Sequence, residues 1–210
     1  MKTWDASTLG RFLDLEAATR YGPPFTFLAL TGCRRGEALG LTWADTNLDA
    51  GQVSIRRTIT EIDGQIHRSN TTKTGRGRSI RLQPDLVNSM RSWRATQAAE
   101  RLLLGPDYAD EDLVFCHRDG RPYIPDMFSR EFDRRVKRHK LPRIRLHDLR
   151  HTYATLALQV GVPAKVVSER LGHSSVTVTL DLYSHVMPAV EGEHADAVAK
   201  LIGRNRRKLL

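Results

Sequence analysis

The chain has 210 residues, of which 40% are hydrophobic and 27% charged, with a formal net charge of +9. This length forms one sizeable core or at most two small domains. The positive excess favours a polyanionic partner, and nucleic acid is the usual one. It is spread over folded-looking segments rather than one amphipathic helix, which disfavours a membrane surface.

The sequence also limits where the chain works. No stretch approaches the roughly 18 apolar residues of a membrane span, and residues 1–4 do not open a signal peptide. The two cysteines, Cys33 and Cys116, lie in no CxxC or metal-ligand spacing, so we expect reduced, packed thiols. We therefore expect a cytoplasmic, nucleoid-associated protein.

The first half of the chain predicts three helical segments and a small antiparallel sheet. Ser7 or Thr8 is expected to cap the first helix, and Pro23 and Pro24 suit the first turn of the second, which ends near 31–32. A third segment covers 37–41. Alternating apolar residues predict a strand from 53 to about 58 and another at 80–82, with turns at 63–64 and 75–77.

The second half predicts mainly helices. We expect them at 86–104, 127–140, 147–160, 163–171, 176–186 and 190–202, with a short strand at 113–115. The fold class is therefore α+β, mostly α-helical, in one domain with a small antiparallel sheet.

Four local strings carry the chemistry of the chain. TGCRRGE covers residues 31–37, TTKTGRGRSIRL 71–82, HDLRHTYAT 147–155, and LGHSSVTVTLDLYSH 171–185. In order and content they resemble the signature segments of the tyrosine recombinases, the phage integrase family. The resemblance covers nearly the whole chain. It implies the catalytic fold of that family over residues 1–210, and suggests a truncated protein that lacks the family's N-terminal DNA-binding domain.

The arginines can stabilise the negative charge that develops on the nonbridging oxygens during phosphodiester cleavage. A guanidinium is always charged and its fork fits two phosphate oxygens, so arginines can replace metal ions. The resemblance assigns Arg34 and Arg150 to the phosphate, with Arg35 as a neighbour on another helical face. Glu37 can lie on the face of Arg34 and orient it. No carboxylate cluster with metal-ligand spacing occurs, so we expect neither a metal nor another cofactor.

Two histidines complete the phosphate-binding set implied by the resemblance. His147 and Arg150 form an H-x-x-R pair, whose spacing places both on one helix face. His173 follows Leu171–Gly172 at a loop, and would donate a hydrogen bond to a nonbridging oxygen of the phosphate. His151 is interpreted as a structural histidine bonded to backbone, and Tyr153 as a core residue.

Tyr183 is the expected nucleophile. The chain has five tyrosines, and Tyr183 is the one that follows His173 at the family spacing. A phenol has a pKa of about 10, so it must lose its proton as it attacks.

Lys73 lies in a glycine-containing hairpin, where the resemblance implies a general acid for the leaving oxygen. Arg76 and Arg78 are expected to hold DNA-backbone phosphates. Residues 127–151 carry nine Lys/Arg against three Asp/Glu, and residues 51–82 carry seven against two. Either run alone would fit a solvated face, but together they favour a phosphate-tracking surface.

The resemblance implies a site-specific recombinase or integrase of a phage or other mobile element, which forms a 3′-phosphotyrosyl intermediate without a metal. A type IB topoisomerase shares these residue types, and a DNA-binding module that has lost catalysis is a third reading. The expected partners are double-stranded DNA at attachment sites, other copies in a homotetramer on DNA (a monomer when isolated), and accessory DNA-bending or directionality proteins. The resemblance also implies that the segment after Pro188 docks on a neighbouring subunit, and the alternative is a terminal helix folded onto its own core.

Overall fold

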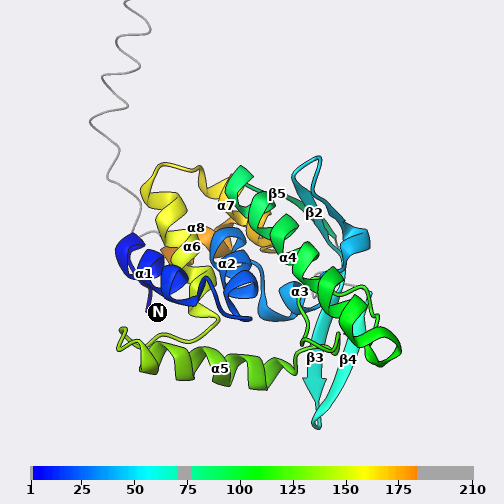
Figure 1. The fold of residues 1–210 in the computed structure, drawn as a ribbon. Coiled ribbons are helices and arrows are strands. Elements are labelled where there is room, and N and C mark those ends of the chain that lie inside the picture. Colours follow the sequence, from blue (N-terminus) through cyan, green and yellow to red (C-terminus); the bar gives the residue numbers. More distant parts are fainter. Residues whose placement is uncertain (1, 71–76, 184–210) are drawn as a thin grey trace, which may run out of the picture.

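The computed structural model describes residues 2–70 and 77–183 (Figure 1). Its helices are α1 (Ala6–Glu16), α2 (Gly22–Thr31), α3 (Arg35–Leu39), α4 (Pro84–Leu104), α5 (Pro125–Arg138), α6 (Asp148–Gln159), α7 (Ala164–Leu171) and α8 (Val176–Tyr183), with 3-10 turns η1 (Trp43–Asp45) and η2 (Gly105–Asp107). Its strands are β1 (Thr46–Asn47), β2 (Gln52–Ile55), β3 (Thr58–Ile62), β4 (Gln65–Ser69) and β5 (Arg78–Arg81). The predicted class, mostly helical with a small antiparallel sheet, is confirmed.

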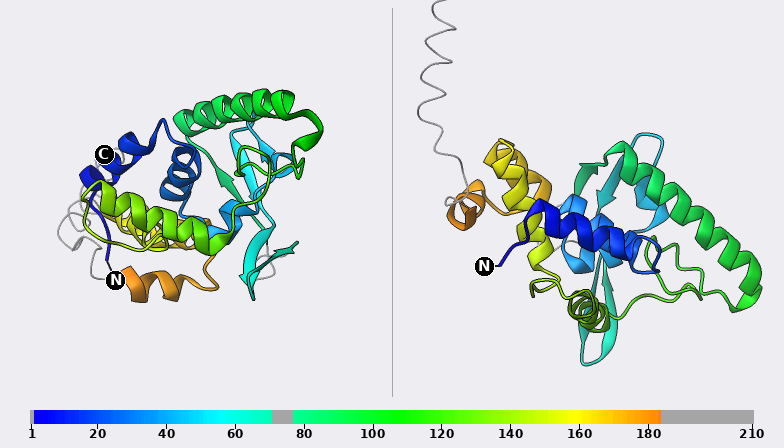
Figure 2. Two further views of the ribbon diagram at one scale, coloured as in Figure 1. Left: turned by 60° about the horizontal axis from the view of Figure 1, so that its bottom comes forward. Right: turned by 60° about the vertical axis from the view of Figure 1, so that its left-hand side comes forward.

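Helix α2 is the central element of the fold. It is apolar on all sides, and Phe25, Phe27, Leu28 and Ala29 are buried, as expected of a helix with no solvent face. It contacts α1, α3, α4 and α6. In the left view of Figure 2, α4 lies along one edge of the molecule and α8 along the opposite edge. The signature strings at 31–37, which follows α2, and at 147–155, on α6, are therefore anchored to the main core.

The strands form two units rather than the single sheet that alternation predicted. β1, β2 and β5 make an antiparallel sheet in the order β1-β2-β5, with Val53 opposite Ile80. β3 and β4 form a separate hairpin, which projects from the body in Figure 1. The predicted strand from 53 to about 58 is thus divided at residues 56–57, and its two parts belong to different sheets.

Several predicted local features differ in the structure. Asp5, rather than Ser7 or Thr8, caps α1, because its carboxylate accepts from the Thr8 N–H at 2.7 Å. The expected strand at 113–115 is a single bridge between Leu113 and Thr42. Residues 113–115 are buried and apolar, and a short buried apolar segment has the same sequence pattern whether or not it forms a strand. Cys33 and Cys116 are buried and form no disulfide, as predicted.

The C-terminal helices carry the last two signature strings. α6 and α8 contact each other, and α7 contacts α6, α8 and strand β5. Residues 75–76 of the predicted turn at 75–77, the extension of α8 to 186 and the helix at 190–202 lie outside the described residues. Within residues 2–70 and 77–183, none of the helices combines the length and apolar content that a bilayer crossing requires.

Candidate active site

Arg34 stands at the N-terminus of α3 and is held by Glu37. Its Nη1 donates to Glu37 Oε1 at 2.9 Å, and its backbone N–H donates to Oε2 at 2.9 Å. Its Nη2 donates to the Gly172 carbonyl at 3.3 Å, which links it to the loop that bears His173. The side chain of Arg34 is 28% exposed, whereas that of Glu37 is only 2% exposed. Glu37 therefore contacts Arg34 as the helical spacing suggested.

Arg78 binds the same carboxylate from β5. Its Nη1 and Nη2 donate to Glu37 Oε1 and Oε2 at 2.9 and 2.7 Å, and its Nε donates to the Arg170 carbonyl at 2.8 Å. Its side chain is 12% exposed. The expected contact of Arg78 with a DNA phosphate does not fit this placement, because its donors face Glu37 and the end of α7. Lys73 and Arg76 lie outside the described residues.

Glu37 is ionised despite its burial. Burial pushes the pKa of Glu37 up, but the hydrogen bond and charge of Arg78, together with those of Arg34, outweigh it and lower the pKa below its ordinary value. One carboxylate thus orients two arginines from different parts of the chain. We call Arg34, Glu37, Arg78 and Arg150 the arginine centre.

Arg150 is the most deeply buried arginine of this centre. It lies on α6, is 4% exposed, and its Nη1 donates to the Gly32 carbonyl at 2.9 Å. Among the described residues no carboxylate lies within ion-pair distance of it. Burial, and then the charge of Arg34, lower the pKa of Arg150 to about 10, so it stays protonated at neutral pH. Three guanidinium groups, with the single carboxylate of Glu37 among them, leave this centre electropositive, which suits an anion.

His147 and His173 both lie beside this positive charge. His173 Nδ1 is 2.8 Å from Thr179 Oγ1. Burial, and then the charges of Arg150 and Arg34, lower the pKa of His173 to about 4. Burial, and then His151 and Arg150, lower the pKa of His147 to about 4. Both imidazoles are therefore neutral at pH 7 in this state, and a bound anion would raise both pKa values.

Tyr183 reaches the same region from α8. It is buried among Ala154, Ala157, Leu158, Val167 and Leu171, which belong to α6 and α7. Burial raises the pKa of Tyr183 to about 12, although the charge of Arg150 acts in the opposite direction. Its Oη lies 2.6 Å from His151 Nδ1. The structure therefore brings Tyr183 close to Arg150 without help from a second chain.

The interpretation of His151 as a backbone-bonded histidine was wrong, because its ring contacts the phenol of Tyr183. Sequence reasoning missed this contact because no local spacing relates His151 to a tyrosine 32 residues away. The sequence HDLRH placed a second titratable ring in a signature string, and that was the available signal. Tyr153, expected in the core, is only partly buried and packs against the same cluster as Tyr183.

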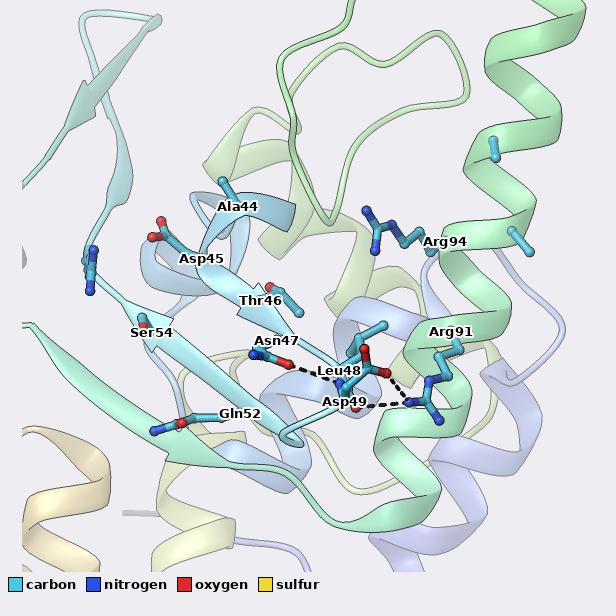
Figure 3. Close-up of a pocket in the computed structure, with 13 residues that line it drawn as sticks. Ala44, Asp45, Thr46, Asn47, Leu48, Asp49, Gln52, Ser54, Arg91 and Arg94 are labelled. Atoms are coloured by element: carbon cyan, nitrogen blue, oxygen red, sulfur yellow. Dashed lines mark hydrogen bonds and ion pairs between the residues drawn. The ribbon is translucent and has the colours of Figure 1, made fainter.

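A second group of arginines lies elsewhere, in what we call the outer hollow. This hollow of about 670 Å³ lies between α4 and the segment from Ala44 to Arg56, and includes Arg56, Arg91 and Arg94. Figure 3 shows Arg91 directed at Asp49, which it contacts at 2.8 Å, and at the Leu48 carbonyl. Arg94 lies over the ring of Trp43. None of the candidate catalytic residues that the structure describes lines this hollow.

Comparisons with known proteins identify the family of the chain. A family model described as the phage integrase family matches residues 10–189. The ICEBs1 integrase of Bacillus subtilis is 29% identical over 204 residues, covering 96% of this chain and 55% of that protein. A XerC-like tyrosine recombinase of Caldanaerobacter subterraneus is 32% identical over 170 residues, covering 75% of this chain and 44% of that protein. This chain thus spans about half the length of these relatives.

Among solved structures, the Tn1549 transposon integrase in complex with transposon right end DNA superposes with a TM-score of 0.78 at 18% identity. The match covers 93% of this chain and 64% of that one. At this identity the likeness shows the fold alone. The family model, however, covers most of the sequence and spans the segments that form the arginine centre and its tyrosine. This chain belongs to the phage integrase family.

Proposed function

We propose that this chain is the catalytic domain of a site-specific DNA recombinase, or integrase, that cleaves and rejoins strands through Tyr183. The observation that carries the proposal is the meeting of Arg34, Arg150, His173 and Tyr183, from four separate elements, around one electropositive centre. A phenol beside an anion site built from arginines suits attack on a phosphodiester.

In the proposed reaction, Arg34 and Arg150 bind the two nonbridging oxygens, and His173 and His147 donate further hydrogen bonds. Tyr183 Oη bonds to phosphorus, and the bond from phosphorus to the 5′ oxygen breaks. The product is a 3′-phosphotyrosyl link and a free 5′-hydroxyl. Lys73 is proposed, on the family resemblance, to protonate the departing oxygen. Attack by a 5′-hydroxyl of another duplex reverses the step and completes strand transfer.

Because Tyr183 is buried here, we expect DNA binding to shift α8 so that a phosphate reaches Oη. Phosphate contacts are also expected along α5, where a hollow of about 750 Å³ includes Arg130, Arg134, Lys137, Lys140 and Arg143. The Tn1549 structure described above contains DNA, which supports duplex DNA as the substrate. A homotetramer on attachment-site DNA, accessory DNA-bending or directionality proteins, and a place at the bacterial nucleoid remain part of the proposal.

Tyr183→Phe tests the nucleophile. Nicked suicide duplexes that carry candidate attachment sites should trap a covalent adduct with the wild type, in the presence of EDTA as well. The variant should give no adduct while it binds the same duplex with nearly unchanged affinity. An adduct that survives in the variant removes Tyr183 from its role. Exchange between two duplexes, rather than resealing of one, separates an integrase from a type IB topoisomerase.

A further inference from the structure

The closest polar neighbour of the Tyr183 hydroxyl in the described chain is an imidazole that the catalytic set above does not include. His151 Nδ1 lies 2.6 Å from Tyr183 Oη, and the two ring centroids are 6.0 Å apart. A neutral imidazole can accept a hydrogen bond at Nδ1 when its proton is on Nε2. The phenol is protonated at neutral pH, since its pKa is raised to about 12. The phenol is therefore the donor.

The surroundings of His151 keep it neutral and able to take a proton. Burial lowers the pKa of His151. Arg150 on the same helix and Arg145 before it act in the same direction, while Asp148 opposes them. The other titratable rings that face it are His147, whose ring is 5.1 Å away edge to face, and His173 from the loop before α8. Protonation of His151 is disfavoured at rest, but Asp148 and an arriving phosphate would both stabilise the imidazolium.

We propose that His151 is the proton acceptor for Tyr183 in strand cleavage, an inference that rests on the function proposed above. As Oη bonds to phosphorus, the O–H bond breaks and its proton passes to Nδ1. The bond from phosphorus to the 5′ oxygen breaks, and that oxygen takes a separate proton from the leaving-group acid. In the rejoining step the imidazolium returns its proton to Oη as the phosphotyrosyl bond breaks.

In this proposal His147, at the N-terminus of α6, and His151, within α6, have different roles. His147 precedes the first turn of α6, contacts the ring of His151, and is assigned to the phosphate. His151 contacts the nucleophile itself. Arg150 lies between them in sequence and lowers the pKa of both histidines and of Tyr183. The string HDLRH thus supplies a phosphate ligand, a guanidinium and a proton acceptor within five residues.

The test measures single-turnover adduct formation across pH on a nicked duplex that traps the wild type, at saturating DNA. The scissile phosphate carries sulfur at the 5′ bridging position, because a thiolate leaves without a proton. The measured rate then reports on proton loss from Tyr183. His151→Asn keeps a hydrogen-bonding group near the position of Nδ1 but cannot take a proton at these pH values. His151→Ala removes the group altogether.

We expect both variants to lose roughly 100- to 10,000-fold in rate at pH 7, the usual contribution of a general base. The wild-type rate should fall in acid as His151 is protonated and level off at higher pH. The variants should instead rise steadily with hydroxide concentration. Added imidazole should partly restore His151→Ala. The matched control is Tyr153→Phe, which removes a hydroxyl from the same helix outside the site, and it should keep the wild-type rate and profile.

Several outcomes would overturn the proposal. If His151→Asn cleaves at the wild-type rate, His151 only positions the phenol. If either variant is faster than the wild type, the contact restrains the nucleophile instead. Slow variants that keep the wild-type pH profile indicate a structural role. Failure of the proposed function would look different, because the wild type and Tyr153→Phe would then form no adduct on any duplex.

A measurement on the unaltered protein keeps the proposal open to test if the variants do not fold. Nitrogen NMR of His151 should show the proton on Nε2 and an unprotonated Nδ1. Tyr183→Phe should raise the pKa of His151, because it removes a hydrogen bond that favours the neutral ring. A proton on Nδ1, or no change of pKa in Tyr183→Phe, would rule out the phenol as donor.

Discussion

The arginine centre and the outer hollow each hold three arginines, with one carboxylate in the first and two in the second, and they differ in their exposure to solvent. In the outer hollow Arg91 is 51% exposed and its partner Asp49 is 97% exposed. In the arginine centre Glu37 is 2% exposed, Arg78 12% and Arg150 4%. Water and salt screen the first pair, so it contributes little energy. In the second, each charge acts on its neighbours with little screening.

The two regions also differ in which parts of the chain build them. The outer hollow is built by α4 and the segment from Ala44 to Arg56, which contains strands β1 and β2 of the three-stranded sheet. The arginine centre joins the ends of α2 and α7, the N-terminus of α3, the start of β5 and the first turn of α6 through direct bonds. The comparison teaches that arginine number does not identify a reactive site. A reactive site is identified instead by the burial of its arginines and by a shortage of carboxylates relative to guanidinium groups.

The sharpest test of this difference compares Arg150→Ala with Arg91→Ala. Removing Arg150 should lower the rate of adduct formation roughly 100- to 1,000-fold, as loss of one buried donor to a transition-state oxyanion does. Removing Arg91 should change the rate at saturating DNA by about twofold at most, since exposed positions contribute little. Single-turnover trapping on a suicide duplex measures both. Equal losses in the two variants would end the distinction.

The stability of the two regions should differ as well. Glu37→Gln removes the buried carboxylate that pairs with Arg34 and Arg78, and should lower the free energy of unfolding by about 3 kcal/mol. Asp49→Asn, at an exposed pair, should lower it by about 0.5 kcal/mol or less. Urea denaturation at neutral pH gives both values. If Glu37→Gln is as stable as the wild type, the buried carboxylate does not hold the centre together.

The stability difference between the wild type and Glu37→Gln should also depend on pH. The pKa of Glu37 in the folded state lies below its ordinary value of 4.5. Its stabilising effect is therefore fully present above about pH 4.5 and is lost as pH falls through the folded-state pKa. The difference in unfolding free energy between the wild type and Glu37→Gln should be constant near neutrality and shrink in acid. A difference that grows as pH falls would mean that the sign of the shift is wrong.

The smallest expected effect concerns the glycine before His173. Gly172 and Gly64 both have positive φ, +70° and +74°. A Cβ on Gly172 would lie 2.9 Å from Arg78 Nη1, whereas none of the described atoms lies within 4 Å of one on Gly64. Either change to alanine should cost about 1–2 kcal/mol of stability through backbone strain. Gly172→Ala alone should also slow cleavage, by roughly tenfold, because it displaces Arg78. Similar cleavage by both variants would exclude a role for that contact.

The sequence alone determined the helical class, the helix that ends near residues 31–32 and the identity of the signature strings. These follow from local periodicity and from residue types at fixed spacing. It also indicated the contact of Glu37 with Arg34, since residues three apart on a helix are neighbours. Local pattern could not separate the strand at 53–58 into two units, because alternation is the same whichever strand lies beside it.

Only the tertiary structure decided which side chains share the centre. Arg78 lies 41 residues from Glu37, and His151 lies 32 residues from Tyr183. Contacts at such separations depend on how α6, α7, α8 and β5 pack, which no local spacing encodes. Burial likewise arises from packing, and it is burial that lowers the pKa of His151 and raises that of Tyr183. The sequence therefore named most of the reactive groups, while the fold determined which of them face one another.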